Sequence, residues 1–162
     1  MSDNSVRLRN ILQTRLELMP EVAMFKWNQK IPVLDDVREQ QLRDKLVRDA
    51  MKLGIQQKTA IILLQGQMDA AKHWQMNLIQ EWEEKNIHTF KDIRDLTQEI
   101  RLDVSRISQE LLELIAGMLK EAEKPDFTKL ETAPQTIPEA VWNHAIMSIR
   151  EVFEGEATGA SL

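Results

Sequence analysis

Hydrophobic residues recur along most of the chain at alternating intervals of three and four residues, the spacing that places side chains on one face of an α-helix. The first such stripe runs from Leu8 to Lys26, and two of its members, Arg15 and Lys26, are cations. Pro20 interrupts the stripe, so we expect the helix either to kink there or to stop at Met19 and restart with Pro20 in its first turn.

A second helix is expected after a proline-containing break, beginning at Asp35 or Asp36 and running to Leu53. Either aspartate can cap the helix, and the pair Asp36 and Glu39 has the spacing of a capping box. Gly54 suits the end of this helix, because glycine readily adopts the left-handed backbone conformation found there.

Three more helices follow from the same spacing. One is expected at about residues 58–85, with Gln75 as the polar member of its apolar stripe, and another at about residues 90–123. Residues 124–136 hold two prolines and read as a connection or a short irregular helix, after which Pro138 suits the first turn of a last helix.

The predicted architecture is therefore all-α, a helical bundle of about five or six helices. We expect a single domain over residues 1–162, with frayed ends at residues 1–5 and 155–162.

Composition narrows the possible functions. With 43% hydrophobic residues, 162 residues can build a sizeable core. The net charge of −5 provides no global basic field that would attract nucleic acid or an anionic membrane, and no apolar run approaches the ~18 residues of a membrane span. The absence of cysteine excludes disulfides and thiolate metal sites. An anionic ligand must therefore be bound by local cations.

Arg15 and Lys26 are the first candidates for such cations. They lie eleven positions apart, which at about 100° per residue returns to the same helix face. Burying a charge costs several kcal/mol, so both side chains either enter one ligand pocket or reach outward to solvent or glutamate partners. Gln75 poses the same choice on another helix, where its amide either meets a ligand or ties two helices together.

Other polar residues give weaker indications. Arg38 falls in a first helical turn, where a cation is mildly unfavourable to the helix dipole, and this misfit hints at a role. The histidines lack metal-site spacing and no Gly-rich phosphate loop is present, so we expect no metal and no cofactor. We expect Ser105 and Ser108 to be ordinary surface or packing residues and the four tryptophans to belong to the core.

Two runs of the sequence resemble the all-helical chorismate mutases, particularly their gamma subclass, which is usually exported from the cytoplasm. They are TRLELMPEVAMFKWNQKIPVLDDVREQQL and GQMDAAKHWQ, and the match covers most of residues 6–82. The later run DLTQEIRLDVSRISQELL is similar to the family's helix that carries a further substrate-binding arginine. Arg101 is the best match for it, with Arg94 and Arg106 as competitors.

The resemblance implies an isomerase that rearranges chorismate to prephenate without metal or cofactor. Arg15 and Arg101 would bind the two substrate carboxylates. Lys26 would contact a carboxylate and the breaking ether oxygen, and Gln75 would donate a hydrogen bond to that oxygen.

The resemblance also implies roles around the substrate ring. Arg38 would position the substrate, and Asp35 and Glu39 would border its ring hydroxyl. At Ala71 the family often has a serine or threonine whose hydroxyl meets a carboxylate. We therefore expect a backbone group or water in its place, or weaker binding.

Partners and compartment follow from the same resemblance. We expect the small molecule chorismate as substrate, no nucleic acid or membrane partner, and a possible homodimer. The polar start of the printed sequence does not read as a signal peptide, whereas the subclass implies a periplasmic or secreted enzyme, with a cytoplasmic one as the alternative. Two other functions stay open from sequence, namely an isochorismate pyruvate lyase of the same fold and a non-catalytic helical interaction domain.

Overall fold

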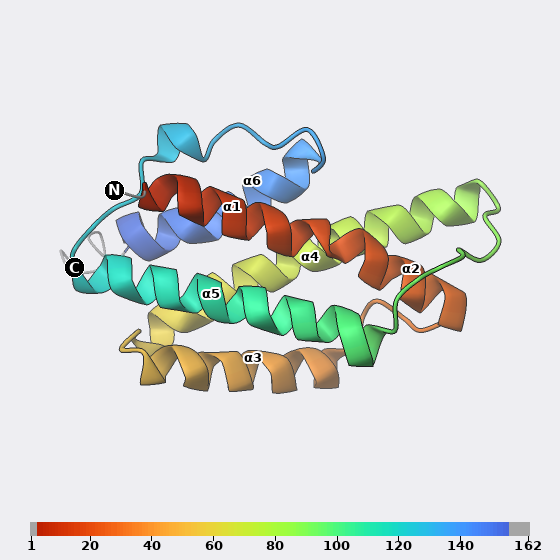
Figure 1. The fold of residues 1–162 in the computed structure, drawn as a ribbon, viewed down its shortest axis with the longest axis horizontal. Helices are drawn as coiled ribbons and strands as arrows, with labels where there is room; N and C mark the ends of the chain where they lie inside the picture. The colour runs from red at the N-terminus through yellow and green to blue at the C-terminus, as the bar shows by residue number, and fades with distance from the viewer. Residues whose placement is uncertain (1–2, 156–162) are drawn as a thin grey trace.

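The computed structural model describes residues 3–155, and this part of the chain forms six α-helices and no strand. The all-α prediction is therefore confirmed (Figure 1). The helices are α1 (Asn4–Glu17), α2 (Met19–Gln29), α3 (Asp36–Lys52), α4 (Gln57–Glu84), α5 (Arg101–Lys120) and α6 (Glu139–Arg150). Short π- or 3₁₀-helical turns add η1 (Leu96–Ile100), η2 (Phe127–Lys129) and η3 (Glu151–Gly155).

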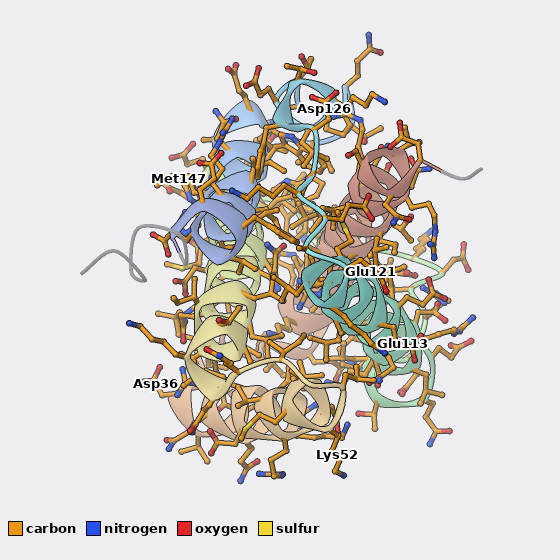
Figure 2. The ribbon with its side chains drawn as sticks, turned by 90° about the vertical axis from the view of Figure 1, so that its left-hand side faces the viewer. Asp36, Lys52, Glu113, Glu121, Asp126 and Met147 are labelled. Carbon is orange, nitrogen blue, oxygen red and sulfur yellow. The ribbon has the colours of Figure 1, made fainter. Side chains whose placement is uncertain are left out.

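The long helix α4 is the centre of the bundle, because it packs against α2, α3 and α6. Helix α5 runs alongside α1 and also contacts α3, so α1, α3, α4 and α5 surround a common interior (Figure 1). Figure 2, which looks along the bundle, shows side chains filling the space between the helices, whereas the exposed Lys52 and Met147 lie at its edge. Within residues 3–155, no helix is both long enough and apolar enough to span a membrane.

The first apolar stripe is divided between two nearly coaxial helices (Figure 1). Helix α1 ends at Glu17 and α2 begins at Met19, with Pro20 in its first turn, so the second of the two expected outcomes, a stop and restart, is the one observed. Proline has no N–H to donate, so it fits best where the backbone donors of a helix have no partner within it. The break does not separate the two cations of the stripe, because both still face the interior.

The start of α3 corrects the predicted cap. Asp35 is the capping residue, and its carboxylate accepts a hydrogen bond from the backbone N–H of Arg38 at 3.0 Å. The capping box of Asp36 and Glu39 is wrong, since the Glu39 carboxylate bonds to Lys72 instead. Helix α3 ends at Lys52, and Gly54 follows with a left-handed φ of 95°, which suits glycine alone.

The fourth long helix begins later than its apolar spacing predicts. Residues 90–95 are not helical, and the side chain of Asp95 caps the turn at Leu96 by accepting from the backbone N–H of Gln98 at 2.7 Å. The loop that contains Phe90 is instead hydrogen-bonded to α2. The backbone N–H and C=O of Phe90 bond to the side chain of Asn28 at 2.8 and 2.9 Å. These tertiary hydrogen bonds replace the helical ones at this end.

Capping and tertiary hydrogen bonds involve the first described residues. The Asp3 carboxylate accepts from the backbone N–H groups of Ser5 and Val6, and the Ser5 hydroxyl accepts from the backbone N–H of Asp126 at 2.8 Å. The predicted fraying of residues 3–5 stays a prediction. Gly155 ends the turn η3, and the expectation for residues 1–2 and 156–162 lies outside the described residues.

The tryptophans occupy the core as predicted, with one exception. Trp74, Trp82 and Trp142 are buried, and Trp142 donates to the backbone carbonyl of Leu130 at 2.7 Å. Trp27 is half-buried and packs edge-on against Trp82, with ring centroids 5.8 Å apart.

Candidate active site

A cavity of about 320 Å³ lies between α1, α2, α3, α4 and α5, a size suited to a small ligand. Apolar side chains such as Met19, Leu46 and Met68 form part of its wall. All eight residues singled out from the sequence line it: Arg15, Lys26, Asp35, Arg38, Glu39, Ala71, Gln75 and Arg101. One chain thus brings together residues that lie up to 86 positions apart in sequence (101 − 15).

Arg15 is a buried cation that has no counter-charge within residues 3–155. Its side chain sits on the cavity face of α1 with 4% of the residue exposed, and its Nε donates to the Ser108 hydroxyl at 3.1 Å. Its Nη1 is buried without a partner, and no carboxylate within residues 3–155 forms a salt bridge with it. Burial lowers the pKa of Arg15 to about 10. Because an unpaired buried charge is costly, the site is arranged for an anion.

Lys26 lies one helix further along the same wall. It is half-buried, and its ammonium has neither a salt bridge nor a hydrogen bond among the described residues. Burial is the main cause that lowers the pKa of Lys26, and the positive charge of Arg101 lowers it further. Arg38 acts in the same direction, whereas the charge of Asp35 opposes it. Positive charge therefore dominates around this ammonium.

Gln75 places an amide in the same cavity from α4, with 5% of the residue exposed. Its Nε2 donates to the thioether sulfur of Met19 at 3.4 Å, and its Oε1 is buried without a partner in the described part of the chain. A thioether is a weak acceptor. The amide is therefore not consumed by a strong bond between helices and is available to a better acceptor in the cavity.

Arg101 is the arginine of α5 that lines the cavity, which separates it from its two competitors. Arg94 lies outside, donating to Asp103 at 2.6 Å and to Glu21 at 2.7 Å, and these carboxylates raise its pKa. Arg106 is exposed and pairs with Asp103. The pKa of Arg101 is lowered by burial and then by the charge of Arg38, so it belongs to the cationic cluster.

Two carboxylates stand at the α3 side of the cavity, and each is already engaged. Asp35 caps α3 through the N–H of Arg38. Glu39 is half-buried and pairs with the Lys72 ammonium at 2.9 Å, and it also accepts from the Gln65 amide at 3.3 Å. These bonds fix the direction of both carboxylates relative to the cavity.

Sequence reasoning missed four polar lining residues: Lys45, Lys72, Ser105 and Ser108. Ser108 is no ordinary packing residue, because it is 3% exposed and bonded to Arg15. A signal for it was present, since Arg101, Ser105 and Ser108 have the spacing of one helix face. The missing information was that this face turns toward Arg15, which only tertiary packing decides.

The histidines do not line the cavity. The rings of His73 and His144 instead meet edge to face, with centroids 6.4 Å apart. Across residues 3–155, no group of three or more His, Cys, Asp or Glu is arranged to hold a metal ion.

Comparison with known proteins agrees with this geometry. A family model described as chorismate mutase type II matches residues 6–76. No curated protein sequence gives a significant match. The fold is similar to that of a secreted chorismate mutase from Yersinia pestis, with a TM-score of 0.76 and 22% identity over 89% of this chain and 95% of that one.

Two further solved structures have the same fold. A chorismate mutase from Burkholderia phymatum gives a TM-score of 0.78 and 19% identity over 91% of this chain and 96% of that one. A chorismate mutase from Burkholderia thailandensis gives a TM-score of 0.74 and 22% identity over 90% of this chain and 98% of that one. The family match spans Arg15, Lys26 and Gln75, and the fold adds Arg101 to the same cavity. Residues 6–76 thus match the chorismate mutase type II family, and the chain has the fold of solved chorismate mutases.

Proposed function

We propose that the cavity is the active site in which this isomerase rearranges chorismate to prephenate. In this reaction the ether C–O bond breaks and a C–C bond forms within one molecule. The site must therefore hold the enolpyruvyl arm over the ring and stabilise the negative charge that grows on the ether oxygen. No nucleophile, cofactor or proton transfer is needed. The observation that carries the proposal is the set of Arg15, Lys26 and Arg101 around one cavity without a carboxylate salt-bridged to any of them in the described residues.

The cations account for the substrate's two carboxylates and for the reacting oxygen. Arg15 and Arg101 bind one carboxylate each, from α1 and α5. Lys26 contacts a carboxylate and the ether oxygen, and Gln75 releases the Met19 sulfur to donate to that same oxygen. Fixed donors in a partly desolvated cavity stabilise the developing charge without having to reorganise during the reaction.

The α3 side of the cavity positions the ring. Arg38 helps to hold the substrate, while Asp35 and Glu39 border its ring hydroxyl. The pairing of Glu39 with Lys72 holds this carboxylate in its place beside the ring. Ala71 lines the wall with a methyl group, so the family's hydroxyl contact is lost at that position.

A substrate comparison tests the proposal directly. Purified protein is incubated with chorismate and, separately, with isochorismate, and the products are identified. We expect prephenate from chorismate and no appreciable pyruvate from isochorismate. Pyruvate release as the faster reaction would contradict the assignment and favour a lyase.

We also propose that the protein is exported, because the similar Yersinia pestis protein is a secreted one. Fractionating the source cells and assaying each fraction tests this, and activity confined to the cytoplasm would contradict it.

A homodimer stays a prediction. Because Arg15, Lys26, Gln75 and Arg101 of the same chain meet at the cavity, we expect activity per chain to be independent of protein concentration.

A further inference from the structure

We infer that the Ser108 hydroxyl on α5 is a further substrate-binding group, which donates to the carboxylate held by Arg15 and supplies the hydroxyl that Ala71 lacks on α4. This inference rests on the proposed function of the cavity. Ser108 lies on α5, whereas the position at which the family often carries a hydroxyl is that of Ala71 on α4.

The hydrogen-bonding state of Ser108 supports this role. Its Oγ accepts from the Arg15 Nε at 3.1 Å, yet within residues 3–155 no acceptor is found for its own hydrogen. A hydroxyl is both donor and acceptor, so half of its capacity is unused although the residue is 3% exposed. By contrast, the buried Ser148 on α6 donates to the backbone carbonyl of Ala145 at 3.0 Å. Ser108 is therefore a buried donor that faces a cavity without a partner.

Arg15 provides a second, independent observation. Its Nη1 is also buried without a partner in the described residues, and its positive charge has no salt bridge. The bond to Ser108 fixes one edge of the planar guanidinium and leaves the rest for a ligand. A carboxylate bound there would accept from the guanidinium and from the Ser108 hydroxyl together. One anion would then satisfy both the Arg15 Nη1 and the Ser108 hydroxyl.

The position of Ala71 explains why a hydroxyl is needed from another wall. Ala71 is 6% exposed and lines the cavity from α4, but a methyl group donates no hydrogen bond. Ser108 lines the same cavity from α5. The hydroxyl contact is thus moved from one helix to another rather than lost.

Kinetics of single and double variants test the inference. We expect Ser108→Ala to lower kcat/KM on the order of 10- to 100-fold, mainly by raising KM for chorismate, as expected for a lost hydrogen bond to a charged group. In the Ser108→Ala background, Ala71→Ser should restore much of the loss. A serine that served only to orient Arg15 would not be replaced by a hydroxyl on α4.

Two further variants separate binding from folding. Ser148→Ala is the matched control, because Ser148 is equally buried and also accepts from a side-chain nitrogen, that of Gln67 at 2.7 Å. It should lower thermal stability without changing KM. If Ser108→Ala does not fold, Ser108→Cys keeps a similar shape with a much weaker donor and should show the same rise in KM.

The outcomes distinguish this inference from the proposed function. An active parent with an unchanged KM in the Ser108 variants would overturn the role of Ser108 alone. A loss in Ser108→Ala that Ala71→Ser does not restore would also overturn substrate contact and leave Ser108 as a positioning residue for Arg15. A parent that neither binds nor converts chorismate would overturn both.

Discussion

Lys26 on α2 and Arg101 on α5 are like charges that line one cavity, and the charge of Arg101 lowers the pKa of Lys26. Burial acts in the same direction and is the larger cause. Both effects make the free site unfavourable for cations and therefore favourable for a dianionic ligand. This local field explains how a chain with a net charge of −5 can capture an anionic substrate.

The pH profile should report this coupling. In the proposed reaction Lys26 acts in its charged form, so kcat/KM should fall as the pH rises through the pKa of Lys26, which is below the ordinary lysine value of 10.5. Replacing Arg101 with glutamine removes a positive charge, which should raise the pKa of Lys26 and move the alkaline limb to higher pH, whatever the loss in rate. Profiles of both proteins from neutral pH upward check this. An alkaline limb that stays at the same pH or moves to lower pH in the variant would contradict the coupling between Arg101 and Lys26.

Lys26→Ala should lower kcat/KM on the order of 10²-fold or more, because it removes a donor that acts on the charge developing in the transition state. Lys52→Ala is its control, since Lys52 is exposed at the end of α3 and does not line the cavity. Steady-state kinetics of the two variants give the comparison. Equal losses in both would remove Lys26 from the reaction.

Gln75→Glu should make the reaction acid-dependent. The Gln75 amide donates at any ordinary pH, so its contribution in the parent should be nearly flat from about pH 5 to 8. A carboxyl group donates only when protonated, and the variant should gain activity as the pH falls. The measurement is kcat/KM against pH for both proteins. A variant with the parent's rate and profile would exclude Gln75 as the donor to the ether oxygen.

Arg15→Met should stabilise the free protein while abolishing most of its activity. Methionine fills similar space without a desolvated charge, and replacing a buried charge in this way commonly raises the free energy of unfolding by about 1–3 kcal/mol. Activity should fall on the order of 10²-fold or more, because one carboxylate loses its cation. Denaturant unfolding measures the change in stability, and steady-state kinetics measure the change in activity. A clear loss of stability would show that Arg15 is compensated inside the fold.

Two glycines offer a matched test of the helix packing. A Cβ added at Gly66 on α4 would lie 2.2 Å from the Ser148 Cβ on α6, so Gly66→Ala must push these helices apart and should cost about 1–3 kcal/mol. A Cβ at Gly117 on α5 meets nothing within 4 Å, and Gly117→Ala should gain roughly 0.5–1 kcal/mol from helix propensity. Thermal unfolding measures both. Shifts of the same sign would contradict this packing.

Much of the fold and the site could be predicted because helical spacing is a local property. Arg15 and Lys26 share a face by their spacing, and α1 and α2 stay in line across Pro20, so both cations reach the cavity. The capping of α3 and the start of α5 were less predictable. Asp35 and Asp36 are equivalent caps by type, and the bonds between Phe90 and Asn28 join segments 62 residues apart.

The sequence could not show which acidic side chain pairs with which basic one at the site. Arg94, Arg101 and Arg106 lie within one segment, and only packing shows that Arg94 is neutralised by Glu21 and Asp103. Glu39 fits a capping box by spacing, whereas the fold gives it Lys72.

The most direct test of the central claim is prephenate formation from chorismate by the purified protein, with the Lys26→Ala variant prepared and assayed in the same way. The proposed site predicts that the parent converts chorismate to prephenate and that the variant is slower on the order of 10²-fold or more. No prephenate from the parent, or equal rates in the two preparations, would contradict it.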